Sequence, residues 1–405
     1  MNIPKLRFKE FTDEWKEYPL KYFTTPIKRK NTNNESDLPL TISSLDGLVD
    51  QRTYFNKVVA SKDMSNYYLL KKGEFAYNKS YSVGFPFGSI KRLDKYNQGA
   101  LSSLYICFQV NNMNSDFIVK YFESPKWHKQ ISLCVAEGAR NHGLLNVNIN
   151  DFFSTKHFLP QLVEQEKIDN FLSTVDKKIE NLANTITSLE NQKKGLLQQI
   201  FSQKLRFKDK NGNNYPNWEK KKLGDIAVLI TKGTTPTNFN DGNINFIKVE
   251  SIINSKINLS KCMSISENTH FSILSRSILK ENDILFAIAG SLGISCIVNK
   301  EILPANTNQA LAIIRLSNNV NINYIFWTLN SNIMKKYIKI SHSIGAQPNL
   351  NLKQLNDFIL PYPCLEEQTK IADFLSAFDR KLDNQKAQLE HWQQIKKGLL
   401  QQMFV

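Results

Sequence analysis

The sequence predicts an α+β protein with two mixed, β-rich globular domains separated by two long antiparallel coiled-coil helices, arranged as a pseudo-twofold cyclic repeat. Three observations support this fold class: a long internal repeat, a heptad spacing of apolar residues within it, and short alternating apolar stretches between its copies. A chain of 405 residues is also long enough for two domains with separate cores. We therefore divide it into segments 1–16, 17–156, 157–202, 203–222, 223–358 and 359–405.

The repeat is the strongest of these observations. Residues 160–201 recur without a gap as residues 363–404, with many identities. The first copy ends in "KKGLLQQIF" at Phe201, and the second ends in "KKGLLQQMF" at Phe404. Repetition over this length indicates a duplicated structural unit.

Segments 157–202 and 359–405 each predict a long helix, because their apolar residues follow alternating spacings of four and three. Pro160 and Pro363 stand just before the expected first turns, and acidic residues follow at the positive end of each helix dipole. Each helix would be a rod of roughly 55 Å. The predicted seam residues are Ile168, Leu172, Val175, Ile179, Leu182, Ile186, Leu189, Leu196 and Ile200, and then Ile371, Leu375, Phe378, Leu382, Leu389, Trp392, Leu399 and Met403.

One seam cannot bury itself, so each helix needs a partner, and the other copy supplies one. The N-terminal segment, 1–16, contains "KLRFK", which recurs in segment 203–222 directly after the first helix. Joined end to end, the chain would spell two turns of one cyclic repeat. The twofold axis that this implies makes the helices antiparallel. A parallel pair, or a dimer of two chains through these helices, is the alternative.

Lys193 and Lys396 interrupt the two seams at equivalent places, where a charged residue lowers stability and helps to fix the register. Gly195 and Gly398 follow, one turn from the helix ends. In a helix interior each is less favourable than alanine by about 1 kcal/mol. These glycines indicate either close approach by another chain or fraying of the helix.

Segments 17–156 and 223–358 occupy equivalent places and predict β-rich domains. Short apolar alternations such as "SSLYICFQV", "DILFAIAG" and "LAIIRL" are punctuated by Asn, Gly, Ser and Asp. Each segment also contains a turn followed by a strand, "LKKGEFAYN" in the first and "LKENDILFA" in the second. Because these segments diverge far more than the helices do, we expect one scaffold that supports two different domains.

The composition favours a partner that is a polyanion. The formal net charge is +15, and both halves of the chain are basic. Nucleic acid is the leading candidate, and a merely basic protein is the alternative. No apolar run has the length of a membrane span, and no signal core follows the first residues, so we expect a cytoplasmic protein with no membrane contact. The five widely spaced cysteines, without a CxxC pair, predict reduced thiols.

Motifs for catalysis or metal binding are missing from the sequence. There is no Pro-Pro pair for an adenine methyltransferase, no GK[ST] loop for a nucleotide-driven motor, and no histidine pair at i, i+4. We therefore expect no catalytic residue, no metal site and no cofactor in this chain. A stand-alone DNA enzyme is disfavoured for the same reason.

These features resemble the specificity subunits of Type I restriction-modification systems. The resemblance rests on "LPQLVEQEKIDNFLSTVDKKI" and "LPYPCLEEQTKIADFLSAFDRKL" at the start of the two helices, on "KGLLQQ" at their ends, and on "TKGTTP" at residues 231–236. It implies that 17–156 and 223–358 are target-recognition domains, each for one half of a bipartite double-stranded DNA target. It further implies that the helices dock two methyltransferase subunits, which recruit restriction subunits for cleavage. S-adenosylmethionine, ATP and Mg would then belong to those partners.

Candidate DNA-binding residues are chosen by side-chain chemistry. Arg and Lys suit guanine, Asn and Gln suit adenine, and aromatic or methyl-bearing groups suit thymine, whereas phosphate contacts position the protein without specifying sequence. Half-sites about one helical turn apart would suit the length of the rod. The alternative function is a non-catalytic nucleic-acid-binding or protein scaffold with two basic domains. The candidates are Lys28, Arg29, Lys30, Lys79, Tyr81, Arg140, Asn141 and His142 in the first domain, and Lys232, Thr234, Thr235, Lys248, Ser291, Asn308, Gln309 and Gln347 in the second.

Overall fold

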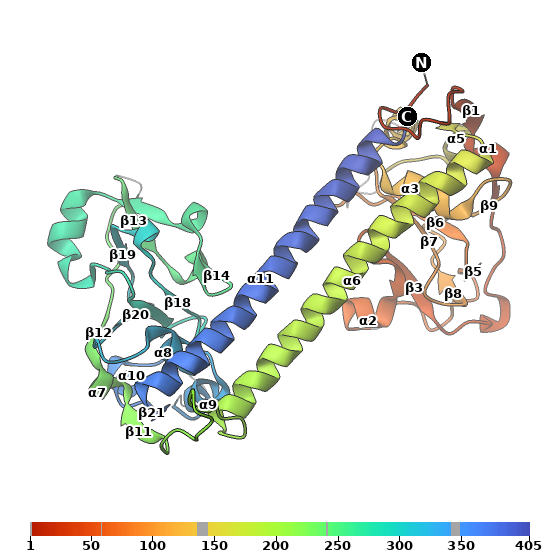
Figure 1. The fold of residues 1–405 in the computed structure, drawn as a ribbon. Helices are drawn as coiled ribbons and strands as arrows, with labels where there is room; N and C mark the ends of the chain where they lie inside the picture. The colour runs from red at the N-terminus through yellow and green to blue at the C-terminus, as the bar shows by residue number, and fades with distance from the viewer. Residues whose placement is uncertain (1, 58, 136–144, 240–241, 342–348) are drawn as a thin grey trace. The chain divides into compact units, whose positions relative to one another are not determined.

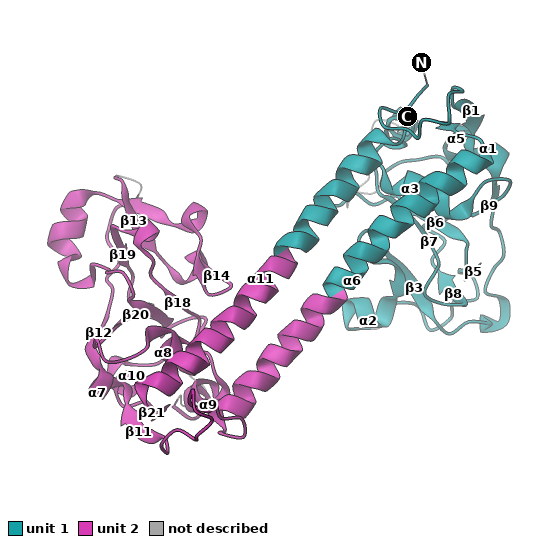
Figure 2. Ribbon diagram, in the orientation of Figure 1, with its two compact units in different colours: residues 1–183, 387–405 teal, residues 184–386 magenta. Residues whose placement is uncertain are grey.

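The computed structural model of the chain contains two compact units, and it describes residues 2–57, 59–135, 145–239, 242–341 and 349–405. Unit 1 consists of Met1–Ala183 and Ala387–Val405, and unit 2 of Asn184–Lys386 (Figure 2). Each unit therefore joins one β-rich domain to a part of both long helices. The six segments predicted from the sequence follow chain order rather than these units, and their boundaries stay predictions.

The β-rich domain of unit 1 is built from two four-stranded sheets, in the orders β2-β9-β6-β7 and β4-β3-β8-β5, and a separate β1-β10 pair. Strands β3 and β8 are parallel neighbours. The strands are β1 (Lys16–Pro19), β2 (Thr24–Pro26), β3 (Pro39–Ser43), β4 (Gly47–Asp50), β5 (Tyr68–Lys71), β6 (Phe75–Asn78), β7 (Ser89–Arg92), β8 (Gln98–Leu101), β9 (Ile106–Val110) and β10 (Lys156–Leu159). The short helices are α1 (Leu20–Phe23), α2 (Gln51–Phe55), α3 (Ser115–Glu123), α4 (His128–Cys134) and α5 (Ile149–Ser154).

Unit 2 repeats this plan with different loops. Its four-stranded sheet has the order β12-β20-β17-β18, its three-stranded sheet the order β16-β13-β19, and β11-β21 and β14-β15 are separate pairs. Strands β13 and β19 are again parallel neighbours. The strands are β11 (Glu219–Lys222), β12 (Ala227–Lys232), β13 (Ile244–Ile247), β14 (Ile252–Ile253), β15 (Lys256–Ile257), β16 (Met263–Ile265), β17 (Ile284–Ala287), β18 (Ser295–Ile297), β19 (Ala305–Thr307), β20 (Leu311–Leu316) and β21 (Ile359–Tyr362). The helices are α7 (Leu223–Ile226), α8 (Ile322–Leu329), α9 (Asn332–Ser341) and α10 (Leu352–Asn356).

The two long helices are α6 (Leu162–Phe201) and α11 (Leu365–Gln402), drawn in yellow-green and blue in Figure 1. Both begin a few residues later than the predicted segments, because β10 and β21 come first and a proline separates strand from helix. Every predicted seam residue is buried or half-buried.

The helices pack together in antiparallel fashion within each unit. In unit 1 the Lys396 ammonium, near the end of α11, lies 2.6 Å from the Asp176 carboxylate in the first half of α6. In unit 2 the Lys193 ammonium, near the end of α6, lies 2.5 Å from the Asp379 carboxylate in the first half of α11. The predicted fold class is therefore confirmed, including the antiparallel helices.

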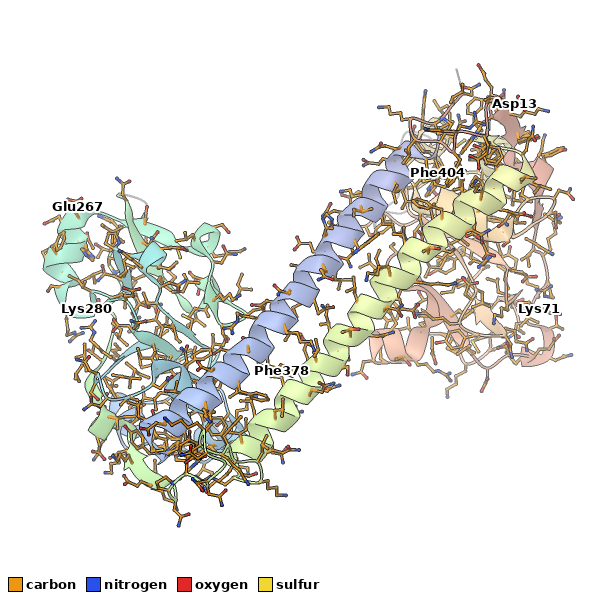
Figure 3. All side chains as sticks on the ribbon, viewed as in Figure 1. Asp13, Lys71, Glu267, Lys280, Phe378 and Phe404 are labelled. Atoms are coloured by element: carbon orange, nitrogen blue, oxygen red, sulfur yellow. The ribbon has the colours of Figure 1, made fainter. Side chains whose placement is uncertain are left out.

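The end of each helix completes a hydrophobic core. In unit 1, Met403 and Phe404 are buried beside Trp15, with ring centroids of Trp15 and Phe404 6.3 Å apart. Figure 3 shows Phe404 at the end of α11. In unit 2, Phe201 packs on Tyr324 at 5.9 Å between ring centroids. The repeated "LLQQ" stretches therefore lead into equivalent cores.

Among the helices that the structure describes, none is both long enough and apolar enough to span a membrane. All five cysteines fall within the described residues and are free thiols, as predicted.

Candidate nucleic-acid interface

In unit 2 the "TKGTTP" loop lies against the end of strand β19. The Thr234 N–H donates to the Thr307 carbonyl at 3.2 Å, and the Thr307 hydroxyl donates to the Ile247 carbonyl of β13 at 2.8 Å. A Cβ on Gly233 would lie only 1.8 Å from the Thr307 carbonyl oxygen, so only glycine fits at this approach. The loop is thus held on the sheet through its backbone, which leaves the Thr234 and Thr235 side chains exposed.

A second segment, η4 (Thr269–Ile273) followed by η5 (Ser275–Ser277), reaches the same strand end. Asn306 of β19 is fully buried, contacts His270 Nδ1, and donates from Nδ2 to the Leu274 carbonyl at 3.0 Å. This grip places Arg276 beside the loop, where its Nη2 donates to Thr234 Oγ1 at 3.2 Å.

The two segments and the β19–β20 turn form one polar surface. Thr235 Oγ1 donates to Gln309 Oε1, and Asn308 precedes it in the turn. We call this surface the Arg276 cluster; it consists of Thr234, Thr235, Arg276, Asn308 and Gln309. Four of these residues were predicted from the sequence. Arg276 is not among the sequence candidates, because a single arginine in "SRS" has no pattern that distinguishes it from other surface arginines.

The remaining candidates of unit 2 lie around this cluster or apart from it. Lys232 is exposed at the end of β12, directly before Gly233. Lys248 follows β13, the neighbour of β19, and its ammonium lies 4.7 Å from the centre of the Phe239 ring. Ser291 is exposed in the β17–β18 turn, which left-handed φ angles at Gly290 and Gly293 make possible. Gln347 lies outside the described residues.

In unit 1, the three predicted cations Lys28, Arg29 and Lys30 differ in whether they form hydrogen bonds or ion pairs within the chain. Lys28 is exposed. The Arg29 guanidinium donates to the Leu69 carbonyl at 3.0 Å and forms an ion pair with the buried Glu74 at 2.6 Å. Lys30 donates to the Asn66 carbonyl at 2.9 Å and lies over the Tyr68 ring. Lys28 is thus the cation of these three that remains turned to solvent.

The β6–β7 loop of unit 1 forms a tight, protruding turn. Ser82 and Phe85 exchange backbone hydrogen bonds of 3.3 and 2.8 Å, and Gly84 has a left-handed φ of 83°. Val83 at the tip is 92% exposed and Tyr81 is 59% exposed. We call residues 79–88 the β6–β7 finger. It includes the predicted Lys79 and Tyr81, whereas Arg140, Asn141 and His142 lie outside the described residues.

Arginines in the described residues are mostly paired with carboxylates. Ion pairs are formed by Arg7, Arg29, Arg52, Arg92, Arg206 and Arg315. Arg315, for example, donates twice to the fully buried Asp283 at 2.7 Å. Arg276 and Arg380 are the exceptions within this part of the chain, and Arg380 lies on α11. Arg276 is therefore the described arginine of the unit 2 domain whose charge is not neutralised by a carboxylate.

The "EQ" dipeptide repeated at the start of both long helices ties each β-rich domain to its helix. In unit 1, Glu164 accepts two hydrogen bonds of 2.8 Å from Arg7 and one of 3.2 Å from Trp15 Nε1, and this pairing raises the pKa of Arg7. The next residue, Gln165, accepts from the Asn114 N–H at 2.9 Å and donates to the Pro160 carbonyl at 2.9 Å. Asn114 caps α3, so one dipeptide orders three segments.

Unit 2 repeats these contacts with the equivalent residues. Glu367 accepts from Arg206 at 3.1 and 2.7 Å and from Trp218 Nε1 at 2.8 Å. Gln368 accepts from the Asn321 N–H at 3.0 Å and donates to the Pro363 carbonyl at 2.9 Å. The repeat in the sequence therefore corresponds to a repeated network of hydrogen bonds.

The lysines that interrupt the seams are paired across the helix interface. Lys396 contacts Asp176 and also Glu123 of α3 at 2.8 Å. Burial alone would raise the pKa of Asp176, but hydrogen bonds from Lys120 and Lys396 outweigh burial and lower it. In unit 2 the Lys193 ammonium contacts Asp379 and lies 4.8 Å from the centre of the Trp327 ring.

Gly195 and Gly398 face open space, because a Cβ on either would meet nothing within 4 Å in this chain. Across the described residues there is no group of three or more His, Cys, Asp or Glu side chains placed to hold a metal ion. What the described loops offer is a set of hydrogen-bond donors and acceptors suited to a nucleic acid.

The sequence is similar to that of known DNA specificity proteins. Residues 215–391 match the Type I restriction modification DNA specificity domain. The chain is 24% identical over 315 residues to the Type I restriction enzyme MjaVIII specificity subunit of Methanocaldococcus jannaschii. This alignment covers 75% of this chain and 73% of that protein. It is 28% identical over 241 residues to the EcoBI specificity subunit of Escherichia coli, covering 53% of this chain and 49% of that one. The match thus spans about half the length of the EcoBI subunit.

The fold is also that of a solved structure. The S subunit of the Type I restriction-modification system from M. genitalium superposes with a TM-score of 0.56 at 17% identity, covering 100% of this chain and 99% of that chain. At this identity the likeness concerns the fold. Residues 215–391 thus match a Type I restriction modification DNA specificity domain, and the chain is similar in sequence and in fold to specificity (HsdS) subunits of Type I restriction-modification systems.

Proposed function

We propose that this chain recognises a bipartite double-stranded DNA target, with the β-rich domain of each unit contacting one half-site. In the same proposal, α6 and α11 dock two methyltransferase subunits, which methylate an adenine in each half-site after flipping it out of the duplex. Restriction subunits join through that complex. S-adenosylmethionine, ATP and Mg are bound by the partners.

The observation that carries the proposal is the repeated domain plan with unlike loops. The sheets β2-β9-β6-β7 and β12-β20-β17-β18 have matching strand orders, while the exposed loops at their ends carry different side chains. One loop set contains the β6–β7 finger, and the other contains the Arg276 cluster. A common scaffold with different polar loops is what two unlike half-sites require.

The helices support the docking of two copies of one partner. Exposed apolar residues stand at equivalent places at the helix starts, Leu162 at 50% and Leu365 at 47% exposure. Gly195 and Gly398 add two equivalent positions with open space around them. Because the repeat presents the same surface twice, it suits two identical subunits.

Mapping of methylated adenines tests the proposal. The chain is co-expressed with its cognate methyltransferase subunit in cells that lack other adenine methylation, and the genome is sequenced by a method that detects N6-methyladenine. We expect methylation at one bipartite motif, and none when this chain is omitted. Methylation that is absent or unchanged in the presence of this chain would refute the proposal.

Exchange of one domain sharpens this test. Replacing residues 17–156 by the corresponding domain of another specificity subunit should change one half of the motif and leave the other half as it was. A change in both halves would contradict the assignment of one half-site to each domain.

A further inference from the structure

We propose that Arg276 recognises a guanine in the half-site bound by unit 2, through the N7 and O6 acceptors that guanine presents in the major groove. This inference deepens the proposed function and rests on it. It names one base and one side chain within a half-site that is otherwise unassigned.

The position of Arg276 is fixed by the buried frame below it. Asn306, with no exposed surface, bonds to the Leu274 carbonyl at 3.0 Å and to the Ser277 hydroxyl at 3.4 Å, so it holds both sides of the turn that contains Arg276. Thr307, the next residue on the same strand, accepts from the Thr234 N–H. One strand end therefore sets both Arg276 and its hydrogen-bond partner Thr234.

Among the described residues, the Arg276 guanidinium has a hydrogen-bond partner at one nitrogen, and its other N–H groups are available to a ligand. The guanidinium donates from Nη2 to Thr234 Oγ1 at 3.2 Å, and the residue is exposed. The other arginine of this domain in the described residues is Arg315, and it forms an ion pair with Asp283. A guanidinium that is oriented but not neutralised can donate two parallel N–H bonds, and guanine N7 and O6 accept such a pair.

The neighbours of Arg276 favour a base edge over a phosphate. Thr235, Asn308 and Gln309 bring hydroxyl and amide groups, which hydrogen-bond base edges and which contribute no charge toward a phosphate. The exposed Lys232, on the strand that leads into the loop, is better suited to the backbone. The cluster therefore combines an oriented guanidinium for guanine with uncharged hydroxyl and amide groups for the adjacent base pairs.

Unit 1 has a different set of groups. Its arginines in the described residues, Arg7, Arg29, Arg52 and Arg92, are all paired with carboxylates. What it exposes instead is the β6–β7 finger with Tyr81 and Val83. The proposed guanine contact is accordingly assigned to the unit 2 half-site alone.

Base substitution on the DNA tests the inference with the unaltered protein. The full complex of this chain and its methyltransferase subunits is titrated with duplexes that carry the mapped motif, in which each guanine of the unit 2 half-site is replaced in turn by 7-deazaguanine. This analogue pairs normally but lacks the N7 acceptor. We expect affinity to fall by about tenfold at one position. Equal affinity at every position, or a unit 2 half-site without guanine, would overturn the inference.

The variant Arg276→Gln completes the test. It should bind the normal and the 7-deazaguanine duplex equally, and its methylation motif should lose the requirement for that one G·C pair while the other half-site is unchanged. Lys300→Gln, a change of an exposed cation that precedes the opposite end of β19, is the matched control and should keep the wild-type pattern. A uniform loss of affinity in Arg276→Gln, with the 7-deazaguanine effect retained, would show a phosphate contact and refute base recognition. If no bipartite motif depends on this chain at all, the proposed function itself fails.

Discussion

At the scale of single residues, the two buried glutamates at the helix starts, Glu164 and Glu367, are expected to be sensitive to loss of their charge. Glu164 is 2% exposed, and the Arg7 side chain that pairs with it is 10% exposed. Glu164→Gln removes the negative charge and leaves a largely buried guanidinium without its counter-charge. We expect the free energy of unfolding to fall by about 3 kcal/mol, measured by denaturant titration followed by tryptophan fluorescence.

Two further variants check this explanation. Glu367→Gln should cost less than Glu164→Gln, because the side chain of its partner Arg206 is 23% exposed and keeps more hydration. Glu166→Gln, an exposed position on the same turn of α6, should change stability by no more than about 0.5 kcal/mol. Equal losses in all three would mean that burial of the ion pair is not the cause.

His157 predicts a pH dependence of stability in unit 1. The imidazole is 2% exposed, and its nitrogens lie 2.8 Å from the Tyr121 hydroxyl and 2.8 Å from Thr155 Oγ1. Burial lowers the pKa of His157 to about 3. The unfolded chain therefore takes up this proton first as the pH falls, so stability is complete above about pH 6.5 and decreases toward pH 3. At pH 5 the loss from this group is about 2 kcal/mol.

The measurement compares the free energy of unfolding of the wild type and of His157→Gln between pH 7.5 and pH 5. The variant is expected to be less stable at pH 7.5 but to lose less as the pH falls. The difference between the two slopes isolates the histidine from other titrating groups. Parallel slopes would contradict a buried neutral imidazole.

Sequence patterns predicted polar loop residues that lie close together, but they did not predict which cations are paired with carboxylates. Thr234, Thr235, Asn308 and Gln309 were chosen as polar loop residues, and the structure gathers them in one cluster. Arg29 was chosen by the same reasoning, yet its guanidinium is occupied by Glu74. Whether a cation is neutralised depends on a carboxylate distant in sequence, and a composition argument does not contain that information.

At the scale of elements, the polar interruption of the helix seam gives a test of register. Lys193 and Asp379 meet across α6 and α11 in unit 2, with side chains 23% and 31% exposed. Lys193→Asp or Asp379→Lys alone places like charges together. The double exchange restores opposite charges, and we expect a favourable coupling of about 1 to 3 kcal/mol in a double-mutant cycle of unfolding free energies.

The control for this cycle is the exposed pair Lys386 and Glu190, with side chains 40% and 50% exposed. Its coupling should be below about 1 kcal/mol, because solvent screens the charges. A coupling of the same size in both pairs would show that Lys193 does not fix the register.

Elements with a long period in the sequence were predictable, and those set by tertiary contacts were not. The heptad spacing gave both helices and their pairing. The strand pairs β1-β10 and β11-β21 bring together residues more than a hundred positions apart. They have no local sequence signal, and they were not predicted at the edges of the helical segments. Strand partners of this kind are chosen by the packed domain and not by the strand itself.

At the scale of the whole molecule, the length of the helix pair is expected to set the spacer of the DNA target. Removal of seven residues from each helix, 181–187 and 385–391, keeps the heptad period and shortens each rod by about 10 Å. This corresponds to about three base pairs of B-DNA. We expect methylation mapping to show both half-sites unchanged and a spacer shorter by about that number, or a complex without activity.

A length-preserving variant is the control for this deletion. Replacement of residues 181–187 by the equivalent heptad 384–390 alters the sequence of α6 but not its length, and the spacer should remain as in the wild type. An unaltered spacer after the deletion would exclude the helices as the ruler.

The packing of Phe404 beside Trp15 affects the order in which the two domains can complete folding during synthesis. Unit 2 occupies one continuous stretch, Asn184–Lys386, whereas unit 1 needs Ala387–Val405 to complete its core. Domains generally fold as units while the ribosome is still elongating the chain. The domain that leaves the ribosome first therefore cannot complete its core until the Ala387–Val405 segment has been made. During that interval the apolar residues of unit 1 that pack against Met403 and Phe404 lack these partners.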